Sequence, residues 1–232
     1  VIFNRAFPYE TAHMLVAAYL VGGFMIASVY AVAMLRGRRD RYHRLGFLIA
    51  FTIAAVSAPL QMVVGDFVAR AVFHDDPVKF AAIELVNNTG KNVPETLGGY
   101  IDDHGKVHAG IKIPGAASLL SGYSTNTKVE GLTSVPARDR PTYAQASTVH
   151  LAWDVMIGLG SALEALSVWF GFVWWRKRDL PKTQWFLRAA AVAGVASVVA
   201  LEAGWGVTEV GRQPCSVQGG SRGPDGANTD GG

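Results

Sequence analysis

Residues 186–214 read FLRAAAVAGVASVVALEAGWGVTEVGRQP, and this stretch decides the class of fold. Its first half, up to Ala200, is an almost unbroken apolar run of the kind that crosses a lipid bilayer as a helix. Four side chains follow at spacings of three, four and three residues, which places them on one helical face: Glu202, Trp205, Glu209 and Arg212. A polar face on a membrane helix costs free energy unless it meets a partner or a cavity. We therefore treat this face as a candidate site.

Three further apolar blocks precede this stretch. The four blocks run over residues 13–35, 45–64, 147–175 and 185–210, and each is close to or above the ~20 residues that a hydrocarbon core requires. Composition agrees, because half of the residues are hydrophobic and only 17% are charged. The sequence therefore predicts an all-α membrane protein with about four transmembrane helices and a long loop between the second and the third.

Two short basic clusters predict the orientation of the helices. Residues 36–44, after the first block, contain five arginines and one aspartate, and residues 176–179 read RKRD after the third block. Short loops rich in Lys and Arg stay on the cytoplasmic side of a membrane. The N-terminus, the long loop and residues 202–214 are then expected on the outer side. Because the net charge of +3 arises mainly from these loops, the sequence does not indicate nucleic-acid binding.

Composition divides the chain into four segments. Residues 1–66 contain the first helix pair, residues 67–146 the extracytoplasmic loop, and residues 147–214 the second helix pair. Residues 215–232 are mostly Gly, Ser, Asn, Asp and Gln, which predicts a disordered or artefactual tail. The chain begins at Val1 rather than Met, so we expect that an upstream portion is missing. Long loops such as this one are usually functional or disordered.

His13 and Met156 are candidate axial ligands of a haem iron. His13 opens the first block and Met156 lies inside the third, so both are expected in the outer half of the bilayer. A histidine at a membrane boundary is more often only hydrogen-bonded, and a lone Met is normally core filler. His150 is a rival ligand, although six residues place it roughly 120° from Met156 around a helix. The residues alone make a His/Met haem geometrically possible.

Lys79 and Glu84 are candidate acid–base residues of the loop. Residues 79–87 could form a short amphipathic helix, on which a spacing of five residues corresponds to roughly 140° of rotation. A straight helix would not aim both side chains at one small ligand, so spacing favours a solvated segment. The alternative is an acid–base pair that binds and deprotonates a quinol at the membrane surface.

The polar face at the end of the fourth block also has two interpretations. Glu209 and Arg212 are three residues apart and could form an interfacial ion pair. Alternatively, Glu202 or Glu209 is a ligand or proton relay, and Arg212 binds an anionic group such as a propionate. Cys215 is the only cysteine, so an intrachain disulfide and a cysteine-based metal cluster are excluded.

Several motifs in this order resemble subunit I of the cytochrome bd-type quinol oxidases. They are EAGW at 202–205 leading to GRQP at 211–214, KFAAIE at 79–84, and WFLRAA at 185–190. Their order and spacing agree with the family over residues 13–214. The resemblance implies a terminal respiratory oxidase subunit of the bacterial cytoplasmic (inner) membrane, with the long loop, of the family's short form, on the outer side. Such an enzyme oxidises membrane quinol and reduces dioxygen to water.

The resemblance also implies cofactors and partners. His13 and Met156 would be the axial ligands of a low-spin haem b, and Lys79 and Glu84 would belong to the quinol site. A high-spin haem b and haem d would be present only in the complete subunit. The partners would be membrane quinol, the lipid bilayer and subunit II of the oxidase.

The last motif would serve the high-spin haem. By resemblance, Glu209 would be the carboxylate at its iron, with Trp205 beside it and Arg212 near haem propionates, while Glu202 would have a supporting position.

Three departures from the family pattern limit what this chain is expected to do. It lacks the four earlier helices and the last helix, Cys215 stands where the family has Trp, and Asp154 stands where some members have Arg. We therefore expect a fragment with no oxidase activity as an isolated chain. The alternative is a non-catalytic four-helix membrane protein that retains the fold without haem.

Overall fold

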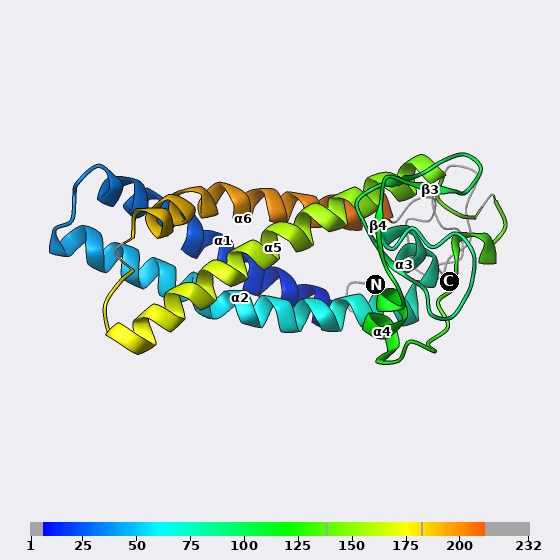
Figure 1. Cartoon of the computed structure of the whole chain (residues 1–232), viewed down its shortest axis with the longest axis horizontal. Coiled ribbons are helices and arrows are strands. Elements are labelled where there is room, and N and C mark those ends of the chain that lie inside the picture. The colour runs from blue at the N-terminus through cyan, green and yellow to red at the C-terminus, as the bar shows by residue number, and fades with distance from the viewer. Residues whose placement is uncertain (1–6, 138, 182, 212–232) are drawn as a thin grey trace. The chain divides into compact units, whose positions relative to one another are not determined.

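Four long helices make up most of the computed structural model (Figure 1), which describes residues 7–137, 139–181 and 183–211. They are α1 (Phe7–Leu35), α2 (Arg41–Asp75), α5 (Tyr143–Lys177) and α6 (Gln184–Gly211). All four are long and apolar enough to cross a membrane. The prediction of about four transmembrane helices is therefore confirmed, and residues between α2 and α5 form the long loop. α2 continues well beyond the apolar block that ends at Val64, and Pro59 lies inside it.

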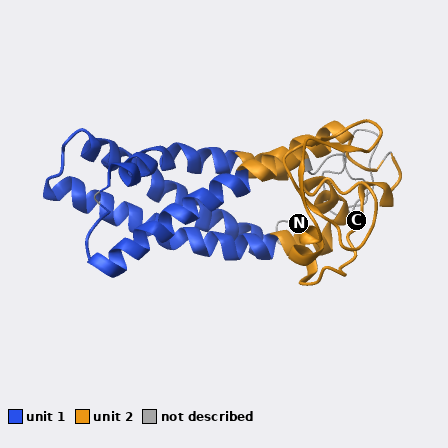
Figure 2. Cartoon of the chain, viewed as in Figure 1, with its two compact units in different colours: residues 1–68, 156–202 blue, residues 69–155, 203–232 orange. Residues whose placement is uncertain are grey.

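The chain forms two compact units, which Figure 2 distinguishes by colour. Unit 1 comprises residues 1–68 and 156–202, which contain most of the apolar length of the four helices. Unit 2 comprises residues 69–155 and the described residues from 203 onward, so it contains the loop and the adjoining helix ends. His13 and Met156 belong to unit 1, whereas Lys79, Glu84, Trp205 and Glu209 belong to unit 2.

The core of unit 1 is built around phenylalanine rings from all four long helices. Phe51 of α2 contacts Phe170 of α5 and Phe186 of α6, with ring centroids 4.8 and 5.3 Å away. Phe24 of α1 meets the same ring edge-on at 5.5 Å. Alanines from α1, α2 and α6 fill the space between these rings. Such small residues allow helix backbones to approach closely, which is how membrane helices gain packing energy.

Two glycines lie at close helix contacts of unit 1. A Cβ added at Gly23 of α1 would lie 2.8 Å from the backbone nitrogen of Ala54 in α2. A Cβ at Gly194 of α6 would lie 2.5 Å from the Ser28 hydroxyl of α1. Real Cβ atoms do not approach backbone this closely, so the α1–α2 contact requires glycine at position 23.

The loop has a fold of its own, with short helices, two hairpin-like strand pairs and a buried core. Its helical elements are α3 (Pro77–Ile83), α4 (Ala116–Gly122) and the 3-10 turn η1 (Leu132–Ser134). Its strands pair antiparallel: β1 (Glu95–Leu97) with β4 (Ile111–Ile113), and β2 (Tyr100–Ile101) with β3 (Val107–His108). Fully or nearly fully buried apolar side chains from successive pieces form the core: Phe80, Leu85, Val86, Val93, Ile101, Val129 and Leu132. The mostly helical chain thus carries a small β component in its loop.

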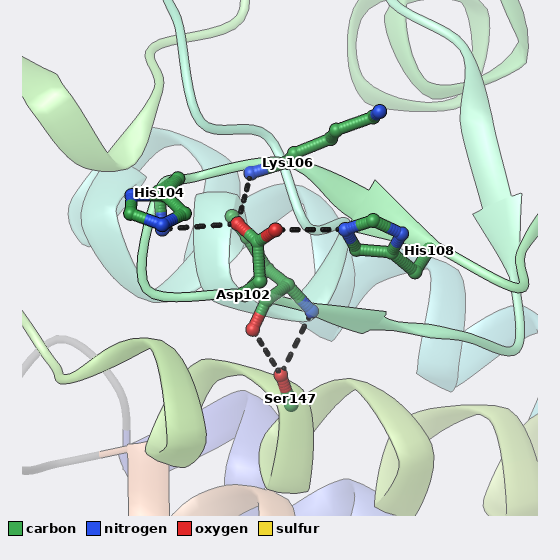
Figure 3. Close-up of polar contacts among 6 residues, drawn as sticks. Asp102, His104, Lys106, His108 and Ser147 are labelled. Carbon is green, nitrogen blue, oxygen red and sulfur yellow. Dashed lines mark hydrogen bonds and ion pairs between the residues drawn. The ribbon is translucent and has the colours of Figure 1, made fainter.

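Asp102 fixes the turn between β2 and β3 (Figure 3). One carboxylate oxygen accepts the backbone N–H groups of His104 and Lys106 at 3.0 and 2.8 Å, and the other lies 2.7 Å from Nε2 of His108. These hydrogen bonds hold the pKa of Asp102 at about 2, the largest effect coming from the Lys106 N–H. Ser147 of α5 accepts the N–H of the β2 residue Ile101 at 3.0 Å and so joins this hairpin to α5.

Candidate functional site

A cavity of about 530 Å³ lies in the loop unit, with Glu84 in its wall. Three lysines from different segments also line it: Lys91, Lys106 and Lys112. Most of the remaining lining is supplied by the chain that follows α3, from Leu85 to Pro94, and by Thr96 and Val107. A pocket with a few convergent charged groups is the usual form of a small-molecule site.

Glu84 is a carboxyl group held in a buried position. It caps the C-terminus of α3, donates its backbone N–H to Phe80 at 3.0 Å, and is only 6% exposed. Burial raises its pKa to about 8, and the nearby carboxylates Glu95 and Asp154 add to the effect. A carboxyl whose pKa lies near neutral pH can take up and release a proton under physiological conditions. Glu84 is therefore the strongest acid–base candidate among the described residues.

Lys79 does not line the same cavity. It lies in the first turn of α3, where its backbone N–H donates to the Asp76 carboxylate at 3.1 Å and its charge lowers the pKa of that group. Burial of Asp76 has the larger, opposite effect and raises its pKa overall. The two ends of α3 thus hold Lys79 and Glu84, and the structure brings only Glu84 to the cavity.

Glu95 and the cavity lysines were not singled out from the sequence. Glu95 opens β1, and burial together with Asp154 raises its pKa. Lys106 and Lys112 come from the two hairpins, so only the fold of the loop brings them close to Glu84. The pair of glycines at 98 and 99, which both have positive φ, is the sequence signal for the turn that makes this possible.

His150 is bound on both sides of its ring. Its Nδ1 lies 2.6 Å from the carbonyl oxygen of Ile83, and its Nε2 lies 3.1 Å from the carbonyl oxygen of Gly98. Asp154, one turn along α5, lies 3.3 Å from Nε2 and accepts the N–H of Gly98. Neither ring nitrogen is available to iron in this arrangement, which removes His150 as a rival to His13.

His13 retains a ring nitrogen that could bind a metal. Its Nε2 lies 2.9 Å from the Gln61 amide nitrogen of α2, whereas its Nδ1 is buried and has no hydrogen-bond partner. A buried imidazole normally satisfies both nitrogens, so an unpartnered one fits a site that an additional group completes. Met156 of α5 is half-buried in the same unit and its sulfur is a suitable iron ligand. The donors present fit a haem iron.

The described residues contain no cluster of three or more His, Cys, Asp or Glu side chains that could hold a metal ion. A haem iron needs no such cluster, because the porphyrin supplies four of its ligands and the protein one or two.

The polar face of α6 is exposed within the described part of the chain. Trp205 is 61% exposed, and Glu202 and Glu209 are also exposed. Val207 lies on the other side of the helix and is buried against Ile83 and Val149. α6 thus buries its apolar side in unit 2 and leaves the polar face uncovered. Arg212, the last member of this face, lies outside the described residues, as do Cys215 and the tail.

The fold is that of a multi-pass membrane protein, and the cavity in its long loop is a candidate small-molecule site. Residues 1–230 match the family model of cytochrome bd terminal oxidase subunit I, and the chain belongs to this family.

Relatives and a solved structure agree with this assignment. A Bacillus subtilis (strain 168) protein provisionally named cytochrome bd menaquinol oxidase subunit I is 32% identical over 219 residues, which are 91% of this chain and 48% of that protein. Cytochrome bd ubiquinol oxidase subunit 1 of the same organism is 26% identical, over 94% of this chain and 48% of the relative. A chain of the bd oxidase from Geobacillus thermodenitrificans superposes with a TM-score of 0.79 at 30% identity, over 92% of this chain and 48% of that chain. The chain thus spans about half the length of the relatives it matches.

Proposed function

We propose that the chain is part of a subunit I that oxidises membrane quinol and passes the electrons through haem b towards the reduction of dioxygen to water. The observation that carries the proposal is Glu84, a buried carboxyl with a pKa of about 8 in the wall of the loop cavity. Family membership supplies the reaction class, because the named relatives are quinol oxidase subunits. The matching chains are bacterial, so the membrane proposed is the bacterial cytoplasmic membrane, with the loop on its outer side.

In this proposal Glu84 receives a proton from the quinol. A quinol bound in the cavity would present a hydroxyl to the carboxyl, and the ionised form of Glu84 would accept one of the two protons that the quinol releases on oxidation. At neutral pH a group with a pKa of about 8 is ionised for roughly one tenth of the time, and its high basicity favours transfer. Lys79, at the other end of α3, is proposed to assist from outside the cavity wall.

His13 and Met156 are proposed to hold the low-spin haem b. The unpartnered Nδ1 of His13 supports this role, since a ligand to it would satisfy a buried polar atom. When bound, the haem supplies one-electron transfer. Gln61 keeps the His13 ring oriented through its contact with Nε2.

The exposed face of α6 is proposed to serve a second haem. Glu209 would be the carboxylate at the high-spin haem b, with Trp205 beside it and Arg212 near the propionates, while haem d would complete the oxygen site. The exposure of Trp205 and Glu209 supports a role toward groups that this chain does not supply. Subunit II is the proposed protein partner, and the isolated chain is expected to lack oxidase activity.

The ligand proposal is tested by a reduced-minus-oxidised spectrum of bacterial membranes that contain the expressed chain. A low-spin haem b signal is expected in the wild type, and it should be lost in His13→Ala and in Met156→Leu. Met62→Leu, at an exposed position of α2, is the matched control and should retain the signal. A signal that survives both ligand substitutions would refute the assignment, and the absence of haem from the wild type would favour the non-catalytic four-helix protein.

A further inference from the structure

Three polar side chains on one face of α5 hold the backbone of the loop. Ser147, His150 and Asp154 are spaced three and four residues apart, so they lie above one another along the helix. We call these three residues the α5 seam. Ser147 accepts the N–H of Ile101, and the other two residues contact Ile83 and Gly98.

Both the backbone N–H and the backbone carbonyl of Gly98 contact residues of the α5 seam. The Gly98 N–H donates to the Asp154 carboxylate, and the Gly98 carbonyl accepts a hydrogen bond from His150 at 3.1 Å. Gly98 has a φ of +67°, a conformation that glycine adopts readily. The turn between β1 and β2 is thereby fixed to α5 through its backbone alone.

The second nitrogen of His150 reaches the end of α3. Nδ1 lies 2.6 Å from the carbonyl oxygen of Ile83, the residue immediately before Glu84. A carbonyl oxygen can only accept, so the two contacts are both hydrogen bonds only when each ring nitrogen carries a proton, as in the imidazolium form of the ring. His150 is 1% exposed, and the carboxylate of Asp154 at 3.3 Å would balance the charge of that form. Glu95, on β1, is the other acid whose charge interacts with His150.

We propose that His150 is a positioning residue of the quinol site: its imidazolium joins the end of α3 to the Gly98 turn and so keeps Glu84 in the cavity wall. The inference rests on the proposed function, because it deepens the role of Glu84. Its physical basis is the pair of buried, charge-assisted hydrogen bonds, which are stronger than neutral ones and restrict the carbonyl that precedes Glu84.

The protonation of His150 can be measured on the wild-type chain, and one variant is needed only to assign the signals. In lipid nanodiscs at neutral pH, ¹⁵N-histidine spectra should show both ring nitrogens of His150 as N–H groups, identified by the loss of these signals in His150→Phe. One unprotonated ring nitrogen would overturn the inference, because one of the two carbonyl contacts would then be absent.

The positioning role is tested with His150→Phe, which keeps a ring of similar size and removes both hydrogen bonds. Backbone hydrogen exchange of residues 84–101 should accelerate, and the affinity for a short-chain quinone should fall about tenfold. The infrared carbonyl band of the Glu84 acid, which in the wild type should disappear at about pH 8, should disappear at lower pH because the side chain becomes hydrated. Thr148→Ala is the matched control, since Thr148 is exposed and bonds to Ala144 of its own helix.

The outcomes separate this inference from the proposed function. If the wild type binds no quinone, the proposed function fails, and the nitrogen spectra and hydrogen exchange still decide the role of His150. If the wild type binds quinone and His150→Phe leaves the affinity, the exchange and the Glu84 band unchanged, the inference is wrong and the proposed function stands. Should His150→Phe fail to fold, His150→Gln supplies the test: it retains one donor group and is expected to give intermediate shifts of affinity and of the Glu84 band.

Discussion

Glu84 owes its high pKa to the point at which α3 ends. Phe80 and Ile83 of the helix are buried, and Glu84, which follows directly as the C-terminal cap, is buried with them. Nothing about its sequence neighbours predicts this, because KFAAIE is equally compatible with a solvated amphipathic helix. The two carboxylates that raise its pKa further, Glu95 of β1 and Asp154 of α5, lie far along the chain.

The high pKa of Glu84 makes the stability of the folded chain dependent on pH. The carboxyl ionises at an ordinary pKa of 4.5 in the unfolded chain and at about 8 when folded. The contribution of Glu84 to the stability of the fold is therefore fully present below pH 4.5 and is lost as pH rises from 4.5 through 8. Gln does not ionise, so this loss is absent from Glu84→Gln. As pH rises from 4.5 to 8, the free energy of unfolding of Glu84→Gln should therefore increase relative to that of the wild type by about 1.4 kcal/mol per pH unit.

This prediction is measured as the difference in melting temperature between Glu84→Gln and the wild type in nanodiscs across the pH range. Glu84→Asp keeps a titratable group and is the control, so its melting temperature should follow the pH trend of the wild type. A difference between Glu84→Gln and the wild type that does not change with pH would contradict the assignment.

At the scale of elements, the contact between α1 and α2 depends on the presence of glycine, which has no Cβ, at position 23. Gly23 faces the backbone of Ala54, whereas the adjacent Gly22 has open space around its Cα. The two positions differ by 100° around the helix, so only one can face a given neighbour. The sequence shows two glycines in an apolar run and does not tell them apart.

We predict that Gly23→Val destabilises the chain and that Gly22→Val changes its stability much less. Overpacking at position 23 forces the two helices apart, at a cost of about 1–3 kcal/mol. The loss of helical circular dichroism with heating in detergent measures both variants. Equal melting temperatures for the two variants would show that α1 and α2 do not pack through Gly23.

One side chain, that of Asp102, fixes the turn of the β2–β3 hairpin. Asp102 accepts two backbone N–H groups and contacts His108, so Asp102→Ala should accelerate hydrogen exchange at the Lys106 amide while Asp103→Ala should not. Because its pKa is lowered to about 2, the contribution of Asp102 is present above its ordinary pKa of 3.8 and is lost as pH falls through 2. An unchanged rate of hydrogen exchange at the Lys106 amide in Asp102→Ala would show that Asp102 does not stabilise the hairpin.

At the scale of the whole molecule, the sequence predicted the helices far better than the loop. Apolar runs longer than a bilayer crossing have few alternatives to helix, so the number of spans followed from composition. The loop core is assembled from isolated apolar residues such as Val93, Val129 and Leu132, which show no period and therefore no sequence signal. The specific roles proposed for His13, Met156, Glu84 and Glu209 came from the resemblance, and the contacts with Gln61 and His150 required the structure.

The orientation of the whole molecule is a prediction of its charged loops. In a Cys215→Ser background, a membrane-impermeant thiol reagent should label Ser124→Cys in the loop from the outside of intact cells. Arg38→Cys, in the basic cluster after α1, should be labelled only after the membrane is permeabilised. Both positions are exposed in the structure, so access depends on the side of the membrane. The reverse labelling pattern would place the loop in the cytoplasm.

The contacts of the α5 seam impose an order on the maturation of the chain. Gly98 and Ile83 are separated from His150 by 52 and 67 residues, and in each case the loop residue is synthesised first. The ribosome must therefore complete the loop before the residues that fasten it exist, and the loop meets them only once α5 has been inserted. Until then the carbonyl groups of Ile83 and Gly98 have no contact with His150, and protease cleavage sites in the loop are accessible. With the loop on the outer side, as the basic clusters predict, a newly made loop is exposed to extracytoplasmic proteases until α5 is inserted.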